Sequence, residues 1–164
     1  MKVLVWIAER TWESCVDAAR FVPGGQVVLL HVIDPDSMEA VSGARAGLLG
    51  RAMPAIDASV EEVLTAGQIR LFDAAEDRLG RPATRLGQRG RVERVVVAAA
   101  ATADVLVMAR DGDHTRLGPR SLGHASRFVL DHAPCQVLLV WPEQPPDLGT
   151  LPPPPGPHGP HSKV

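Results

Sequence analysis

The stretch ADVLVMARDGDHTRLGPRSLGHASRFVLDHAPCQVLLVW, residues 103–141, decides the fold of this chain. Its apolar run Val105–Met108 is typical of a buried strand, and Val137–Trp141 is a second such run. Between them lie a glycine-containing loop and a segment with helical periodicity. The stretch is therefore a strand–loop–helix–strand unit. Backbone N–H groups of such a loop, placed at a helix N-terminus, suit the binding of a phosphate.

The rest of the chain repeats this alternation of strands and helices. Short apolar runs predict buried strands over Val3–Ile7 and Val27–Ile33, and a weaker edge strand over Ala83–Gly87. Apolar spacing predicts further helices over Trp12–Val22, Ile56–Leu79 and Val92–Ala101. The longest of these helices is expected to be amphipathic, with apolar positions at Val60, Val63, Leu64, Ile69, Leu71, Phe72 and Ala75. Residues 37–53 fit either a short helix or a mobile loop.

This alternation predicts an α/β fold, a doubly wound five-stranded parallel sheet with helices on both faces. We expect the strand order 3-2-1-4-5. Because that order reverses between the first and fourth strands, a ligand crevice should lie outside their carboxyl ends. The loops Ala8–Thr11 and Ala109–Leu122 would border it.

Composition excludes several classes of protein. The 164 residues are 45% hydrophobic and 22% charged, which fits one globular domain. A net charge of −2 argues against a nucleic-acid partner. No apolar run reaches the ~20 residues that span a bilayer, and the N-terminal run is too short for a signal peptide. We expect a cytoplasmic protein with no membrane partner. Cys15 and Cys135 lack the spacing of a metal site and are expected to be buried thiols.

The composition changes at Pro142, because the last 23 residues contain nine prolines, Pro142 included. Such a segment buries too little to fold, so we predict a domain over residues 1–142 and a disordered Pro-rich tail over 143–164. The run Pro152–Pro155 is a candidate ligand for an aromatic groove on a protein partner. A passive solubilising tail is the alternative.

Four segments together carry a family resemblance. They are KVLVWI (2–7), VVLLHVID (27–34), ADVLVMARDG (103–112) and LGHASRFVLDHAPCQVLLV (122–140). With them the chain resembles a UspA-type universal stress protein domain over about residues 1–142. The resemblance implies the same strand order and dimers that pair their last strands. It implies ATP or AMP as ligand in one branch of the family, and no general enzymatic activity.

The nucleotide-binding branch has an Asp after the first strand, and G-x-x-G, nine residues and G-[ST] after the fourth. Here Ala8 stands at the position of the Asp, with Glu9 one residue further on. Ala109 and Gly112 take the positions of the first two glycines. The third glycine follows after ten residues and is itself followed by a histidine in place of the hydroxyl residue.

We therefore predict a degenerate nucleotide- or phosphate-binding site. Its candidate residues are Ala8, Glu9, Val32, Ala109, Arg110, Gly112, Gly123, His124 and Ala125. The N–H groups of Gly123, His124 and Ala125 can face an anion at the start of the last helix. Positive charge around the loop comes from Arg110, Arg116, Arg120 and Arg127. Ordinary solvated charge is the alternative interpretation of these arginines.

No catalytic set and no metal site stand out. Ser121 and His124 share a loop with Asp111 and Asp113, but no nucleophile-elbow pattern surrounds the serine. We expect a non-catalytic regulatory or binding protein. A weak ATPase, and a ligand-free dimeric scaffold that recruits partners through its tail, are the alternatives. The apolar last strand, Gln136–Trp141, would leave an open sheet edge, so we predict a homodimer that pairs it.

Overall fold

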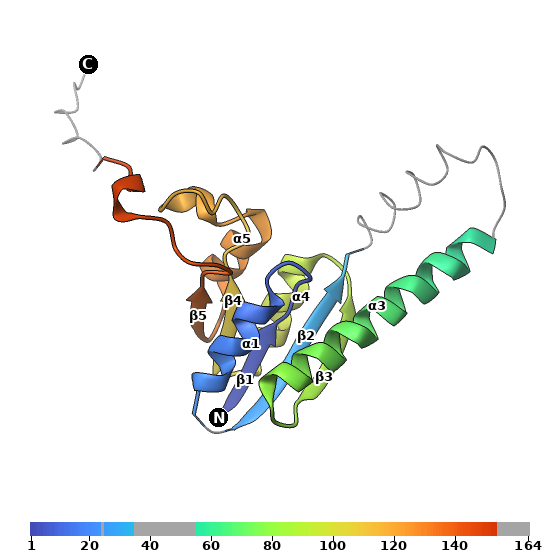
Figure 1. The fold of residues 1–164 in the computed structure, drawn as a ribbon. Coiled ribbons are helices and arrows are strands. Elements are labelled where there is room, and N and C mark those ends of the chain that lie inside the picture. The colour runs from blue at the N-terminus through green and yellow to red at the C-terminus, as the bar shows by residue number, and fades with distance from the viewer. Residues whose placement is uncertain (24, 35–54, 154–164) are drawn as a thin grey trace, which may run out of the picture.

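The computed structural model describes residues 1–23, 25–34 and 55–153, except for the side chains of 55–60. A five-stranded parallel sheet has the order β3-β2-β1-β4-β5, as predicted (Figure 1). Its strands are β1 (Lys2–Trp6), β2 (Gln26–Ile33), β3 (Thr84–Arg89), β4 (Val105–Ala109) and β5 (Gln136–Val140). The α-helices are α1 (Trp12–Phe21), α3 (Ala55–Leu79), α4 (Val92–Ala100) and α5 (His124–His132). The helix or loop expected at 37–53 lies outside the described residues.

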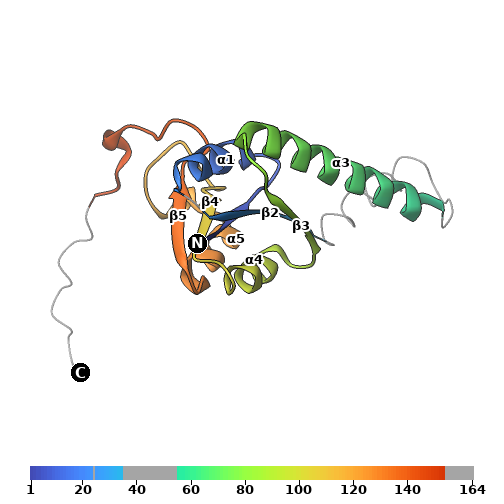
Figure 2. The ribbon, with the colours of Figure 1, turned by 90° about the horizontal axis from the view of Figure 1, so that it is seen from below.

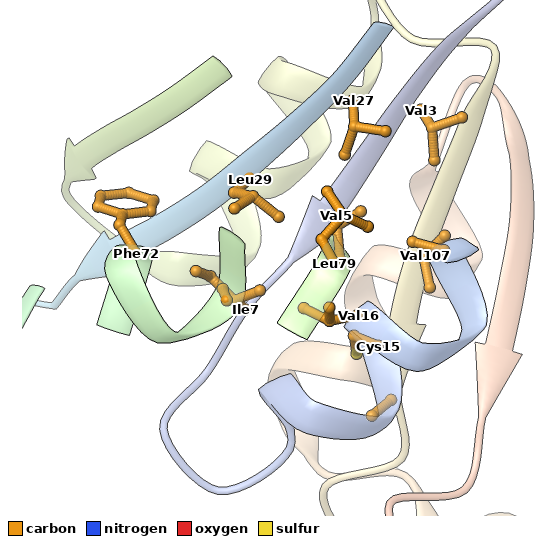
Figure 3. Close-up of a cluster of buried hydrophobic side chains, with 13 residues drawn as sticks. Val3, Val5, Ile7, Cys15, Val16, Val27, Leu29, Phe72, Leu79 and Val107 are labelled. Carbon is orange, nitrogen blue, oxygen red and sulfur yellow. The ribbon is translucent and has the colours of Figure 1, made fainter. Parts of the chain in front are cut away.

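Helices cover both faces of the sheet, with α1 and α3 on one side and α4 and α5 on the other (Figure 2). Alternate residues of β1 point to opposite faces, so Val5 packs under α1 and α3 while Leu4 packs toward α4 and α5. Figure 3 shows the first of these two cores. Burial on both faces explains why the strands are continuous apolar runs, and each buried Val or Leu contributes roughly 1.5–3 kcal/mol.

Helix α3 covers the sheet only with its C-terminal half. Phe72, Ala75 and Leu79 are buried, whereas Val63 and Ile69 are 57% and 51% exposed. Two of the apolar positions expected on this amphipathic helix therefore lie outside the core. For Val63 the reason is length: 25 helical residues extend about 37 Å, but the longest strand, with 8 residues, extends only about 26 Å. The helix runs past the sheet (Figure 1), and Val60 lies outside the described side chains.

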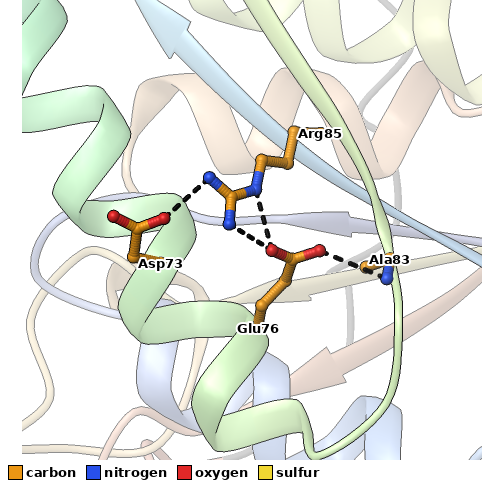
Figure 4. Close-up of polar contacts among 4 residues, drawn as sticks. All are labelled: Asp73, Glu76, Ala83 and Arg85. Carbon is orange, nitrogen blue, oxygen red and sulfur yellow. Dashed lines mark hydrogen bonds and ion pairs between the residues drawn. The ribbon is translucent and has the colours of Figure 1, made fainter.

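The edge strand β3 is tied to α3 by charge rather than by apolar packing. Arg85 was expected to point outward, but it points toward α3 (Figure 4), and its Nη1 lies 2.7 Å from Oδ1 of Asp73. It also forms an ion pair with Glu76, which accepts a further hydrogen bond from the N–H of Ala83 (Figure 4). The hydrogen bonds that Arg85 donates to Glu76 and Asp73 raise the pKa of Arg85.

The two thiols differ in their surroundings. Cys15 of α1 is buried, and burial raises its pKa to about 12. Cys135 precedes β5 and is only half-buried, which partly corrects the expectation of two buried thiols. In the described parts of the chain, no helix is long and apolar enough to cross a lipid bilayer.

The segment after β5 follows a defined path as far as residue 153. It contains a short 3-10 turn, η2 (Leu148–Thr150), in which Asp147 accepts a hydrogen bond from the N–H of Gly149. Residues 143–153 of this segment belong to the tail that was predicted from the sequence to be disordered. The rest of that tail, 154–164, lies outside the described residues, so the division of the chain at residue 142 stays a prediction.

Candidate functional site

A cavity of about 360 Å³ opens at the carboxyl ends of β1 and β4, where the strand order reverses. It is lined by Ala8, Glu9, Arg10, Thr11, Asp111, His114, Pro142 and Glu143. A smaller recess of about 20 Å³ beneath it is lined by Trp6, Ala8, Thr11, Ala109, Asp111 and Ser126. The cavity, called the loop cavity below, lies between the two loops at which the sequence placed the crevice.

A second cavity, of about 450 Å³, lies between the ends of β1 and β2 and helix α3, and is called the helix cavity below. It shares Ala8 and Glu9 with the loop cavity. Its apolar wall is formed by Trp6, Ile7, Val32, Ile33, Val63, Leu64 and Val92. Polar side chains come from His31, Asp34, Gln68 and Arg70. The two cavities place Ala8, Glu9 and Val32 of the predicted site together.

His31 is the buried titratable group of the helix cavity. Its Nδ1 lies 2.9 Å from the amide nitrogen of Gln68, which donates to it, so the ring proton belongs on Nε2. Nε2 lies 3.8 Å from the Oε1 atom of Glu9. Burial lowers the pKa of His31, and the charge of Glu9 partly offsets this effect. The neutral ring therefore presents an N–H donor beside a carboxylate acceptor.

The loop between β4 and α5, residues 110–123, is held together by its own backbone. The N–H of Gly112 donates to the carbonyl of Ser121 over 3.0 Å, and that of Asp113 donates to the carbonyl of Arg120 over 2.9 Å. A Cβ atom at residue 112 would lie 2.4 Å from the Arg120 oxygen. Gly112 thus permits a close approach between two backbone segments, and in this conformation its N–H is not available to a phosphate.

Gly123 is the N-cap residue of α5 and has no side chain to cap the helix, but its own N–H is bound by Asp111. The Oδ1 atom of Asp111 accepts a hydrogen bond of 2.7 Å from the N–H of Gly123, twelve residues away. A Cβ atom at residue 123 would lie only 2.8 Å from that oxygen, so glycine allows the approach. A carboxylate is favoured at the positive end of a helix. One of the three N–H groups predicted to face a phosphate thus donates to the chain's own carboxylate.

Arg110 is bound inside the loop. Its guanidinium lies 4.6 Å from the ring centre of Trp141 and donates to the hydroxyl of Ser121. That hydroxyl, which is buried, donates in turn to the carbonyl of Gly118 over 2.7 Å. Ser121 is therefore engaged by an arginine and a carbonyl rather than by a histidine, which does not support a Ser–His hydrolytic set. His114 meets the edge of the Trp141 ring at 6.1 Å.

The remaining predicted residues are spread around α5 and β4. Arg127 donates to the carbonyls of Pro119 and Leu122, and Arg116 pairs with Asp113 at 3.4 Å. His124 is exposed, whereas Ala125 packs against the core between the sheet and α4. Ala109 is buried at the end of β4. Most of the arginines predicted to attract a phosphate thus interact with groups of the loop itself.

Arg10 and His114 lie in the two loops that the sequence analysis placed at the crevice, although neither was named as a site residue. Sequence reasoning missed the other lining residues Pro142, Glu143, His31, Gln68 and Arg70. His31 sits inside a continuous apolar run, where no spacing singles it out. Glu143 falls in the segment taken for a tail. A local signal exists for the contact between Trp141 and Arg110. Trp141 directly follows an apolar strand, and the chain contains an arginine-rich loop, so a guanidinium stacked on the indole ring could be expected.

Comparison with known proteins agrees with the fold described above. The model of the Universal stress protein family matches residues 2–140. Among curated proteins, no sequence matches significantly. The solved structure of the hypothetical protein MJ0577 has a TM-score of 0.65 at 20% identity, over 87% of this chain and 96% of that chain.

Two other solved structures carry the family name. The universal stress protein UspA from Lactobacillus plantarum has a TM-score of 0.54 at 17% identity, over 85% of this chain and 97% of its own. A universal stress protein in complex with cAMP has a TM-score of 0.55 at 15% identity, over 87% of this chain and 98% of its own. At these identities the likeness shows the fold, while the family match spans most of the sequence. The chain therefore belongs to the universal stress protein family.

Proposed function

We propose that this chain is a non-catalytic regulatory domain that binds a nucleoside-type ligand carrying at most one phosphate group. The observation that carries this proposal is the pair of cavities that meet at Ala8 and Glu9, where the strand order reverses. Ligands of open α/β sheets bind at such a point. Together the two cavities offer one apolar and one polar compartment.

The helix cavity suits the base of the ligand. Its wall from Trp6 to Val92 is largely apolar, as binding sites for flat heterocycles usually are. The Nε2–H group of His31 and the carboxylate of Glu9 give one donor and one acceptor at its inner edge. An adenine ring offers both acceptor nitrogens and an amino group to such a pair. Glu9 thereby takes up the role that the Asp of the resembled motif has in other members.

The loop cavity suits a sugar with little negative charge. Glu9, Asp111 and Glu143 bring carboxylates to its wall, against the single guanidinium of Arg10. Like charges a few ångströms apart repel even in a partly aqueous site. The helix N-terminus could offset this, but the N–H of Gly123 already donates to Asp111, which adds a further negative charge there. These groups favour adenosine, cyclic AMP or AMP over ATP, and a structural neighbour was solved with cAMP.

Calorimetry with adenosine, cyclic AMP, AMP and ATP tests the proposal. We expect adenosine and cyclic AMP to bind most tightly and ATP most weakly. Gly67→Leu is the informative variant, since Gly67 lines the helix cavity and nothing lies within 4 Å of a Cβ built there. The leucine should fill the cavity and abolish binding without harm to the helix, whereas Gly67→Ala should bind nearly as the wild type does.

The two alternatives make different predictions. If ATP binds most tightly and phosphate is released from it, the weak ATPase is favoured over a regulatory domain. If no ligand of the series changes the heat signal or the melting temperature, the ligand-free scaffold is favoured. In either case the proposed ligand class is wrong.

A further inference from the structure

The segment from Trp141 to Pro153, called the strap below, begins where the family match ends at residue 140. In both ribbon views it leaves β5 and runs beside the loop between β4 and α5 (Figures 1 and 2). Its contacts fall at three places: on Arg110, on Leu117 and at the mouth of the loop cavity. Each joins the strap to the candidate site.

The first contact fixes the start of the loop. The ring of Trp141 carries the guanidinium of Arg110 at 4.6 Å on one side and meets His114 edge-on at 6.1 Å. The N–H of Arg110 also donates to the carbonyl of Val140 over 2.9 Å. The loop therefore leaves β4 in a direction set by the first residue of the strap.

The second contact fixes the middle of the loop. The hydroxyl of Thr150 donates to the carbonyl of Asp147 over 2.7 Å and accepts from the N–H of Leu117 over 3.0 Å. The turn η2, capped by the Asp147 side chain, holds the hydroxyl in this orientation. Thr150 thus uses both its donor and its acceptor capacity to join the strap to a loop residue 33 positions away.

The third contact is with the cavity itself. Pro142 and Glu143 line the loop cavity together with Glu9 and Arg10. Glu143 is an exposed carboxylate of this lining, and Asp111 supplies another. The strap therefore contributes both shape and negative charge to the site.

We propose that the strap is part of the binding site. Thr150 positions the loop between β4 and α5, and Glu143 selects against ligands that carry negative charge at their sugar end. The positioning role stands on the hydrogen bonds alone. The selective role rests on the proposed function, because it concerns the ligand of the same cavity.

Amide hydrogen exchange of Leu117, followed by NMR, tests the positioning role in the full chain. Thr150→Val removes the acceptor at nearly constant shape and should speed the exchange of this amide by about tenfold, the equivalent of one net hydrogen bond. Thr150→Ser keeps the hydroxyl and should preserve the protection. Thr65→Val makes the same change on exposed α3 and should have no effect. Equal exchange in the Thr150→Val variant and the wild type would overturn the positioning role.

Calorimetry with adenosine and cyclic AMP tests the selective role. Glu143→Gln should raise the affinity for cyclic AMP roughly two- to tenfold, as removal of one partly screened charge does, and leave that for adenosine unchanged. Asp77→Asn removes one charge from exposed α3 and should change neither. If Glu143→Gln and Asp77→Asn change the affinity for cyclic AMP equally, Glu143 does not select the ligand. The same conclusion holds if Glu143→Gln leaves this affinity unchanged. If no protein binds either ligand, the proposed function and the selective role fall together, and the exchange result still decides the positioning role.

Discussion

The carboxylate of Asp111 accepts a hydrogen bond of 2.7 Å from the N–H of Gly123, so the loop that precedes α5 caps this helix with its own side chain. One of the three N–H groups predicted to bind an anion at the start of the helix is therefore engaged from within the chain. Gly112, the other glycine kept from the resembled motif, serves a backbone contact with Arg120. Both glycines thus support the loop's own structure in this conformation.

Replacing Asp111 tests this capping contact. Loss of a side-chain cap costs about 1 kcal/mol, so Asp111→Ala should lower the free energy of unfolding by about that amount. The free energy of unfolding of Asp111→Asn should lie between those of the wild type and Asp111→Ala, because the amide oxygen still accepts a hydrogen bond. Urea denaturation measures the difference, with Asp77→Asn on exposed α3 as the control. A stability of Asp111→Ala equal to that of the wild type would show that the cap contributes nothing.

Two glycine substitutions should have opposite effects. Gly112→Ala puts a methyl group 2.4 Å from the carbonyl oxygen of Arg120, and since backbone must move, we expect a loss of about 1–3 kcal/mol. Gly67 lies in the middle of α3, and a methyl group there has no atom within 4 Å. Gly67→Ala should therefore raise the free energy of unfolding by about 0.5–1 kcal/mol. Thermal unfolding of both variants checks this. Equal melting temperatures would contradict the close contact at Gly112.

The fold follows from the sequence because its strands are buried on both faces. The runs Val3–Ile7 and Val27–Ile33 have no polar alternation apart from His31, and only a parallel sheet covered by helices hides such strands. The strand order then fixes the edge at which a crevice forms. Periodicity does not say where a sheet ends, however, so it cannot tell that the apolar position Val63 of α3 lies beyond the core.

The details of the site depend on contacts that leave no local pattern. Asp111 caps a helix from twelve positions away, whereas caps recognisable from sequence lie beside their helix. Thr150 reaches Leu117 over 33 positions, from a segment whose proline content predicts disorder. The cavity's position could therefore be predicted, but not the residues that fill its phosphate end or close its outer wall.

The edge strand β5 leads to a prediction about assembly. Leu138 is 38% exposed on this strand, and the sheet has no further strand beyond it within the described residues. An open apolar edge favours pairing with a second copy, so we expect a homodimer through Gln136–Val140. Leu138→Lys should give a monomer by light scattering at tens of micromolar. Ile69→Lys, at the exposed Ile69 of α3, should remain dimeric. A monomeric wild-type chain would remove this idea.

The last prediction concerns His31, whose pKa burial lowers below its usual value of 6.5. The folded state therefore prefers the neutral ring more than the unfolded state does. This contribution to stability is fully present above pH 6.5 and is lost as the pH falls through the lowered pKa of the folded state. His31→Gln should weaken this part of the acid dependence in urea denaturation between pH 7 and about pH 5.

The carboxylate of Glu9, 3.8 Å from Nε2, is the group that raises the pKa of His31 against the effect of burial. Glu9→Gln removes that charge, so the pKa of His31 should fall further, and an NMR titration of its ring measures the shift. Glu143→Gln removes a carboxylate from the loop cavity only, and should leave the titration of His31 in the helix cavity unchanged. If Glu9→Gln leaves the pKa where it was, Glu9 does not face the ring in solution. The donor–acceptor pair assigned to the base of the ligand would then be wrong.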